Sequence, residues 1–265
     1  MRPKLGQHFL RDQRVIADIL AAAALRPGER VLEVGPGEGV LTQPLCAAVQ
    51  PEGRVVAIEQ DRLLARTLPP MPGLEVVEGD AVKADLAALG RFDAIVANLP
   101  YLISGPITVA FLDLLAQPAT AWRRAVLMYQ QEFALRLLAA PSTHDYGRLT
   151  VHAARRVRVT KVRHVPPGAF APPPRVESLV VRLEPHAKPP FAVTDERLWQ
   201  AVVDGTFQRR RKQLRNSLPA AVGGLGVPFA RAEGLLQELG WEERRPENLS
   251  PAEFAQLANR LAEGA

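Results

Sequence analysis

The chain has 265 residues and a mass of 28.9 kDa, which is long for one domain and indicates a large domain with a smaller companion. Hydrophobic residues make up 47% and charged residues 23%, which excludes wholesale disorder, and every apolar stretch is interrupted too early to span a membrane. The single cysteine, Cys46, excludes an intramolecular disulfide, so we expect a cytoplasmic protein without a membrane partner.

The net charge of +5 is unevenly distributed along the chain. Residues 1–120 carry 11 basic and 14 acidic side chains, residues 121–218 carry 18 and 7, and residues 219–265 carry 4 and 7. The middle segment therefore has a net charge of +11 between two acidic segments. This asymmetry points to a phosphate-rich partner, although a solvated arginine-rich surface would produce the same count.

Short apolar runs alternate with segments of helical period from Arg30 to Val181, after a short amphipathic helix expected at Val15–Leu25. We expect buried strands at Val31–Val34, Val55–Ile58, Leu74–Val77, Phe92–Ala97 and Ala125–Tyr129. Helices are expected between them at Leu41–Val49, Arg62–Leu68, Ala81–Leu89 and Ile107–Ala116, and further strands at Leu149–Val165 and Val176–Leu183. Such alternation is typical of a parallel sheet covered by helices on both faces.

A proline-rich segment, Glu184–Val193, interrupts this pattern and is predicted to be a linker. Helical segments follow near Asp195–Leu218, Pro228–Leu239 and Pro251–Ala262. We therefore predict an α/β fold, with a Rossmann-like domain over residues 1–187 and a small all-helical C-terminal domain over residues 188–265.

A glycine-rich turn, Gly35-Pro-Gly-Glu-Gly39, follows the first predicted strand, where glycines let the backbone approach a ligand closely. Glu59 ends the next strand, where a carboxylate can accept both hydroxyls of an adenosine ribose. A nicotinamide dinucleotide and S-adenosylmethionine both fit this pattern. The spacing of the last two glycines departs from the dinucleotide fingerprint, and Asp80 after the third strand can accept an adenine amine or cap the following turn. S-adenosylmethionine is therefore favoured.

The fourth strand ends in Asn98-Leu-Pro-Tyr101, which suits a planar base that carries an amino group. An adenine amine is a poor nucleophile because its lone pair is delocalised into the ring. The Asn98 side-chain oxygen and the Leu99 carbonyl can accept its two N–H groups, Pro100 stiffens the turn, and Tyr101 can stack on the base. Catalysis would then consist of positioning the amine, with the proton lost after methyl transfer.

Five motifs stand in order along the chain: Gly6-Gln-His-Phe-Leu10, Glu33-Val-Gly-Pro-Gly-Glu-Gly-Val-Leu-Thr42, Gly79-Asp80, Asn98-Leu-Pro-Tyr-Leu-Ile-Ser104 and Phe170-Ala-Pro-Pro-Pro-Arg-Val-Glu-Ser178. Together they resemble the ribosomal RNA adenine N6,N6-dimethyltransferases, over about residues 4–218. The resemblance implies a class I methyltransferase domain that uses S-adenosylmethionine. It also implies a substrate of two adjacent adenosines near the 3′ end of small-subunit (16S) rRNA, within the assembling 30S particle.

The resemblance also assigns roles to individual residues. The residues implied to bind the cofactor are His8, Leu10, Gly35, Gly37, Glu59, Asp80 and Asn98, with Gln7 supporting the opening loop. Phe170 is implied to face the target adenine opposite Tyr101, which completes a catalytic set of Asn98, Leu99, Pro100, Tyr101 and Phe170. Glu177 and Leu102 depart from the family's usual residues, and Leu102 could alter how the neighbouring nucleotide is held.

Two basic clusters are predicted to bind RNA phosphates. They consist of Arg155, Arg156, Arg158, Lys161 and Arg163, and of Arg209, Arg210, Arg211, Lys212 and Arg215. For the second cluster a solvated helix face is the competing interpretation.

The histidines show no metal-ligand spacing, so no metal is expected, and we expect a monomer. Two other functions fit the same motifs. One is a large-subunit rRNA adenine methyltransferase of the antibiotic-resistance type, and the other is a non-catalytic, rRNA-binding ribosome-assembly factor.

Overall fold

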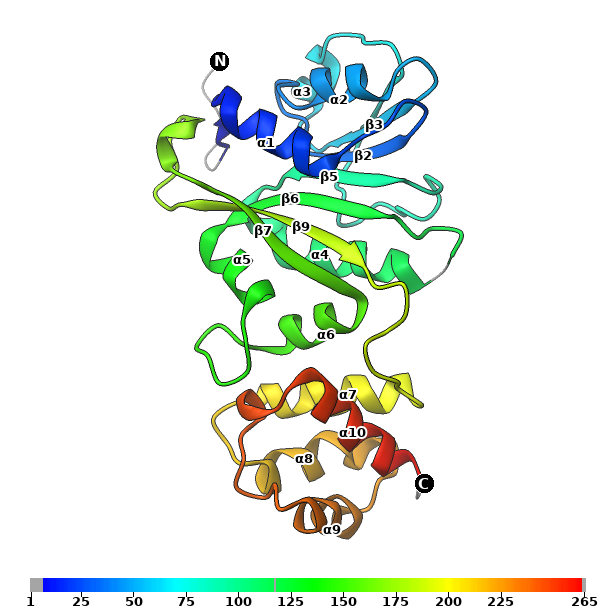
Figure 1. The fold of residues 1–265 in the computed structure, drawn as a ribbon, viewed down its shortest axis with the longest axis vertical. Coiled ribbons are helices and arrows are strands. Elements are labelled where there is room, and N and C mark those ends of the chain that lie inside the picture. The colour runs from blue at the N-terminus through cyan, green and yellow to red at the C-terminus, as the bar shows by residue number, and fades with distance from the viewer. Residues whose placement is uncertain (1–6, 117, 264–265) are drawn as a thin grey trace. The chain divides into compact units, whose positions relative to one another are not determined.

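The computed structural model describes residues 7–116 and 118–263, so Gly6 of the opening motif lies outside the described residues (Figure 1). The chain divides into two compact units. The first comprises residues 1–134 and 158–185, and the second comprises residues 135–157 and 186–265. No helix of the described residues is long and apolar enough to cross a membrane.

The first unit is built on a sheet with the strand order β4-β3-β2-β5-β6-β9-β7 (Figure 1). These strands are β2 (Arg30–Val34), β3 (Arg54–Glu59), β4 (Leu74–Glu78), β5 (Ala94–Asn98), β6 (Arg124–Gln130), β7 (Val157–Val165) and β9 (Ser178–Pro185). From β4 to β6 neighbouring strands are parallel, and β9 runs antiparallel to β6. The carboxyl ends of β2, β3 and β5 therefore share one edge of the sheet.

Helices cover both faces of this sheet, as its alternating pleat requires. They are α1 (Gln13–Ala23), α2 (Thr42–Val49), α3 (Arg62–Thr67) and α4 (Ser104–Asp113), with 3-10 turns η1 (Tyr101–Ile103), η2 (Leu114–Ala116) and η3 (Pro167–Ala169). The division between the two units falls within α5 (Gln131–Leu138). Val126 and Met128 of β6 share a buried core with α1 and α2. Tyr129, which points to the opposite face, contacts Thr108 of α4 through a 2.7 Å hydrogen bond between their hydroxyls.

A two-stranded sheet ties the opening segment to the body of the first unit. It joins β1 (Phe9–Leu10) to β8 (Phe170–Ala171), with Phe9 opposite Ala171 and Leu10 opposite Phe170. Asp12 then caps α1 by accepting the backbone N–H groups of Arg14 and Val15. The strand pairing and the cap therefore fix residues 9–12.

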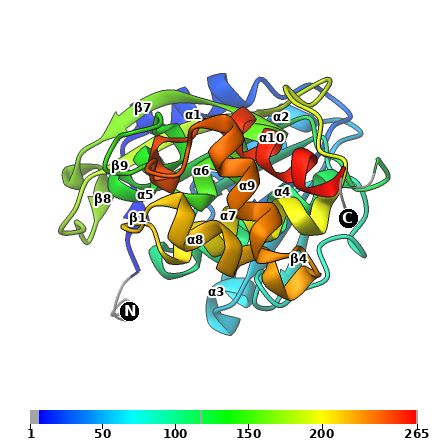
Figure 2. The same ribbon diagram turned by 90° about the horizontal axis from the view of Figure 1, so that it is seen from below.

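The second unit gathers α6 (Arg148–Arg156), α7 (Glu196–Gln208), α8 (Leu214–Val222), α9 (Phe229–Leu239) and α10 (Pro251–Ala262), with turns η4 (Gly223–Leu225) and η5 (Pro246–Asn248) (Figure 2). Trp199 and Phe254 are fully buried in its core. Tyr146 and Val151 belong to the same core, so residues 135–157 pack with the C-terminal helices. The expected domain boundary between residues 187 and 188 lies close to the observed division between Pro185 and His186. Residues 135–157 were expected in the first domain, but they belong to the second unit.

Two of the predicted elements have the wrong secondary structure, and the strand at Leu74–Val77 is not buried as expected, because β4 is an edge strand of the sheet. Leu149–Val165 was predicted as a single strand, but its first half is α6 and only Val157–Val165 is β7. Ala81–Leu89 was predicted as a helix, but it consists of turns. The side chains of Asp80 and Asp85 accept backbone N–H groups just after themselves, and such local bonds compete with a helix.

Candidate active site

A pocket in the first unit lies at the carboxyl ends of β2, β3 and β5. The residues that line it are Gln7, His8, Phe9, Leu10, Glu33, Gly35, Pro36, Gly37, Glu38, Val40, Leu41, Glu59, Leu64, Asn98, Leu99, Pro100 and Tyr101. The structure thus brings together three sequence motifs: the opening segment, the glycine-rich turn and the Asn98–Tyr101 run. This edge is where open parallel sheets bind ligands.

The glycine-rich turn is shaped by backbone angles that favour glycine. Gly35 and Gly37 have φ angles of +70° and +57°, in the left-handed region. A Cβ on Gly37 would lie 3.1 Å from the Phe9 ring, so the opening segment closes directly onto the turn. The Glu59 carboxylate fixes the same turn from β3, because one oxygen accepts the Gly37 N–H at 3.1 Å and the other accepts the Asp61 N–H at 2.9 Å.

Glu33 contributes a second, more deeply buried carboxyl group to the pocket. Its side chain is 1% exposed, and its Oε2 has no hydrogen-bond partner among the described residues. Burial raises the pKa of Glu33 to about 8, and the negative charge of Glu59 adds to the increase. At neutral pH Glu33 is therefore predominantly protonated.

We expect Glu33→Gln to change how stability depends on pH. Because the pKa of Glu33 is raised on folding, the native state holds a proton that the unfolded state releases above about pH 4.5. Wild-type stability should therefore fall relative to Glu33→Gln between pH 5 and about 8, by roughly a few kcal/mol, and level off above that range. Urea unfolding of both proteins across this range measures the difference, and parallel pH profiles would contradict the raised pKa.

The lining of the pocket distinguishes between the two cofactors left open by the sequence. It contains three glutamates (Glu33, Glu38 and Glu59) and no lysine or arginine among the described residues. A pyrophosphate would meet no lysine or arginine in this lining, whereas the sulfonium and ammonium groups of S-adenosylmethionine suit it. The unpartnered Oε2 of Glu33 and the close glycine turn also fit that cofactor.

Asp80 and Phe170 do not line the pocket. Asp80 follows β4 beside the end of β3, since the Gly79 N–H donates to the Glu59 carbonyl at 2.9 Å. Its carboxylate accepts the Val82 N–H at 3.0 Å and so caps a turn. The Phe170 ring is 5% exposed and packs in the core near Leu10. Contacts of these two side chains with an adenine stay predictions, and for Phe170 the ring would have to move.

Asn98 ends β5 at the floor of the pocket. The Gly35 and Pro100 backbones meet here, because a Cβ on Gly35 would lie 3.6 Å from Pro100 Cδ. The Asn98 amide nitrogen donates to the His8 carbonyl at 3.5 Å, so its Oδ1 is left as an acceptor. The backbone N–H of Leu99, whose carbonyl is the second proposed acceptor, donates to the Met128 carbonyl.

Tyr101 is held from two sides at the mouth of the pocket. Its hydroxyl lies 3.1 Å from the Ser178 hydroxyl, and its ring lies 5.9 Å from the His8 ring at an interplanar angle of 31°. His8 is itself fixed, since its Nδ1 donates to the Pro172 carbonyl at 2.9 Å. Burial raises the pKa of Tyr101, partly offset by the Ser178 contact, so the side chain is a neutral phenol and not a base.

Several pocket residues were not anticipated from the sequence. Phe9, Glu33 and Leu64 line the pocket, and Ser178 orients Tyr101. Glu33 and Ser178 lie within two of the five sequence motifs, and this position is the only feature of the sequence that could have indicated a role in the site. Leu64 comes from α3, and no motif marked it. Among the described residues no group of three potential metal ligands is present.

The first predicted RNA-binding cluster is divided between the two units, and most of its charges are paired. Arg155 and Arg156 of α6 pair with Glu196 in the second unit. In the first unit Arg163 pairs with Asp18, and Arg158 lies 3.9 Å from Glu184. Lys161 is exposed and has no ion pair among the described residues. The sequence count therefore overstated the charge available to a ligand.

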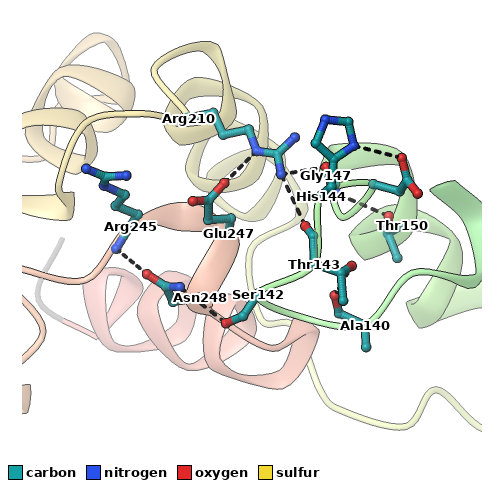
Figure 3. Close-up of polar contacts among 11 residues, drawn as sticks. Ala140, Ser142, Thr143, His144, Gly147, Thr150, Arg210, Arg245, Glu247 and Asn248 are labelled. Carbon is teal, nitrogen blue, oxygen red and sulfur yellow. Dashed lines mark hydrogen bonds and ion pairs between the residues drawn. The ribbon is translucent and has the colours of Figure 1, made fainter.

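In the second cluster Arg210 differs from its neighbours (Figure 3). Its guanidinium donates to Glu247 and to the carbonyl of His144, both at 2.7 Å, and to the Thr143 carbonyl at 3.2 Å. It therefore fastens the end of α7 to the loop before α6 and to η5. The neighbouring cations are exposed and form no ion pair among the described residues; they are Arg209, Arg211, Lys212 and Arg215.

Three features meet at one edge of the parallel sheet: the glycine turn after β2, the acidic residue Glu59 at the end of β3 and the Asn-Leu-Pro-Tyr run after β5. Together they define a Rossmann-like class I methyltransferase domain. Over residues 1–262 the sequence matches the family described as "Ribosomal RNA adenine dimethylase". The chain belongs to this family.

Named relatives agree with this assignment. The chain is 41% identical to "Ribosomal RNA small subunit methyltransferase A" of Geobacter metallireducens, over 98% of this chain and 95% of the relative. A crystal structure of a dimethyladenosine transferase from Plasmodium falciparum superposes with a TM-score of 0.81 at 29% identity, over 97% of this chain and 98% of that one. The 23S rRNA methyltransferase ErmE superposes with a TM-score of 0.69 at 30% identity, over 96% and 99%.

Proposed function

We propose that this chain transfers methyl groups from S-adenosylmethionine to the N6 amines of two adjacent adenosines near the 3′ end of small-subunit rRNA, in assembling 30S particles. The observation that carries the proposal is the convergence of Asn98, Leu99 and Tyr101 on the pocket that holds Glu33 and Glu59. The names and full-length similarity of the small-subunit relatives support the choice of this substrate over the large subunit.

The chain's residues position the amine. Asn98 Oδ1 and the Leu99 carbonyl accept its two N–H groups, which localises the nitrogen lone pair and directs it toward the cofactor side of the pocket. The His8 carbonyl keeps the Asn98 amide nitrogen turned away from the substrate. S-adenosylmethionine supplies an electrophilic methyl group on a positively charged sulfur. The amine then loses a proton to water, since neither Asn98 nor the neutral Tyr101 is a base.

The second methylation places a different demand on the same residues. After one transfer the amine keeps a single N–H, so only one of the two acceptors retains its hydrogen bond. Stacking must then carry more of the positioning, and Tyr101 is suited to this because Ser178 and His8 hold it from two sides. We therefore expect Tyr101→Ala to impair the second transfer more than the first.

The direct test uses purified protein, labelled S-adenosylmethionine and undermethylated small subunits, followed by digestion and nucleoside analysis. The proposal predicts N6,N6-dimethyladenosine at two adjacent positions of the small-subunit rRNA. Large subunits and mature small subunits are the matched controls. Labelling of large subunits instead would favour the large-subunit activity, and binding without methyl transfer would favour a non-catalytic assembly factor.

We also propose that the exposed cations of the second unit dock the rRNA, as one chain on each particle. Arg209, Arg211, Lys212 and Arg215 surround the anchored Arg210 on one short segment. Arg210 holds that segment in place, because three hydrogen bonds connect it to the rest of the unit. Phosphate contacts made by such side chains give a salt-dependent affinity with little sequence preference.

We expect the double substitution Arg211→Ala/Lys212→Ala to weaken binding to undermethylated small subunits. It should also reduce the slope of log K against log salt by about 0.7–0.9 for each phosphate that the variant no longer neutralises. Titrations at several KCl concentrations and fixed Mg²⁺ measure this slope. Arg54→Ala, an exposed cation at the amino end of β3, should leave the slope unchanged. Arg210→Ala should instead lower the stability of the second unit. Equal slopes for wild type, the double variant and Arg54→Ala would refute the docking role.

A further inference from the structure

Leu102 is the most exposed large apolar side chain in the described part of the chain, at 95% exposed. The next in the first unit, Val109, is 48% exposed. Leu102 lies in η1, directly after Tyr101 at the mouth of the active-site pocket, but it does not line the pocket itself. Single exposed leucines are common on protein surfaces, so the significance of Leu102 comes from its place beside Tyr101 and not from its exposure alone.

The local structure does not depend on the Leu102 side chain. The η1 turn is closed by backbone bonds, with Ile103 N–H donating to the Pro100 carbonyl and Ser104 N–H to the Tyr101 carbonyl. The neighbouring Leu99 is 1% exposed and supplies the apolar anchor of this run. The side chain of Leu102 is therefore free to contact something outside the first unit.

What approaches this mouth follows from the site beneath it, so the next step rests on the proposed function. An adenine can reach Asn98 only after it leaves its base stack, and that extrusion opens a gap between the neighbouring bases. Apolar side chains such as leucine are used by nucleic-acid-binding proteins to fill gaps of this kind. Leu102 is adjacent in sequence to the residue that would stack on the extruded base, and it carries no charge to be desolvated.

We propose that Leu102 is a wedge, which enters the rRNA stack where the target adenosine has left it and so holds the base in the pocket. The wedge acts on the extruded state, whereas the basic clusters act on docking. Changes at Leu102 should therefore alter turnover without altering affinity for the particle. They should leave cofactor affinity unchanged, because Leu102 is outside the pocket lining.

The experiment compares Leu102→Ser, Leu102→Ala and Leu102→Met with wild type on undermethylated small subunits. We expect kcat to fall about tenfold for Leu102→Ser, equivalent to ~1.4 kcal/mol, and less for Leu102→Ala. Leu102→Met should stay near wild type because it keeps an apolar side chain of similar size. Dissociation constants for the particle and for S-adenosylmethionine should stay within about twofold of wild type.

Val109→Ala is the matched control, an exposed apolar residue on α4 outside the site, and it should turn over like wild type. Particles that carry 2-aminopurine next to the target adenosines provide a second readout, since its emission rises when its stacked neighbour leaves, and this response should differ between Leu102→Ser and wild type. Unchanged turnover in Leu102→Ser, or a loss explained by weaker particle binding, overturns the wedge. Absence of transfer by wild type would instead overturn the proposed function.

Discussion

Asn98→Ala should abolish most methyl transfer while leaving the cofactor bound. The substitution removes the side-chain oxygen at the end of β5 that we propose accepts a hydrogen bond from the target amine. The lone pair would then stay delocalised in the adenine ring, and the amine would be poorly placed for attack. Loss of orientation on this scale costs about 100-fold or more in turnover. Single-turnover labelling of undermethylated small subunits, with saturating enzyme, measures the step directly.

The contrast with Glu59→Ala makes this prediction specific. Glu59 fixes the glycine turn through the Gly37 N–H, so its loss should raise the dissociation constant for S-adenosylmethionine and be partly overcome at high cofactor concentration. Asn98→Ala should bind the cofactor within a few-fold of wild type and stay slow at saturation. Melting temperatures of both variants check that the first unit is folded. A normal single-turnover rate for Asn98→Ala would contradict the positioning mechanism.

The central strands and the active-site edge were predictable because buried parallel strands are continuous apolar runs that end in polar motifs. Residues 149–156 were not, because Thr150 and Val151 favour a strand locally while the tertiary contacts favour a helix. In α6, Arg155 and Arg156 reach Glu196, forty residues along the chain. Alternation of apolar and polar residues does not mark the boundary, because it runs through Leu149–Ala153 of α6 as well as through Val157–Thr160 of β7.

The predicted RNA-binding residues show a different limit. A charge count treats every arginine alike, but Arg163 and Arg210 are committed to acidic partners that are distant in sequence. Only the fold separates them from exposed cations such as Arg211 and Lys212. The pocket is the converse case, since its excess of glutamates over cations arises only where β2 with its glycine turn and β3 meet.

Arg124→Met should destabilise the first unit by about 3–5 kcal/mol, the usual cost of breaking a buried ion pair. Arg124 is one of the cations of the +11 segment, yet it is 8% exposed and pairs with the buried Glu29. Its guanidinium also donates to the carbonyls of Ala23 and Ala24, which end α1. Removal would leave the buried Glu29 carboxylate without its ion pair, retaining the Arg26 N–H as a donor, and would take a donor from two helix-terminal carbonyls.

Hydrogen exchange read by mass spectrometry tests this prediction unit by unit. Protection should fall in α1 and β6 but not in α7 or α10. Arg123→Ala is the matched control, because that neighbouring side chain is 59% exposed, its ion pair with Asp93 spans 3.5 Å, and exposed pairs contribute about 0–1 kcal/mol. Arg124→Met/Glu29→Met should be more stable than Arg124→Met alone, since it removes the unpaired carboxylate as well. If the double variant is no more stable, the cost comes from the α1 carbonyls rather than from the ion pair.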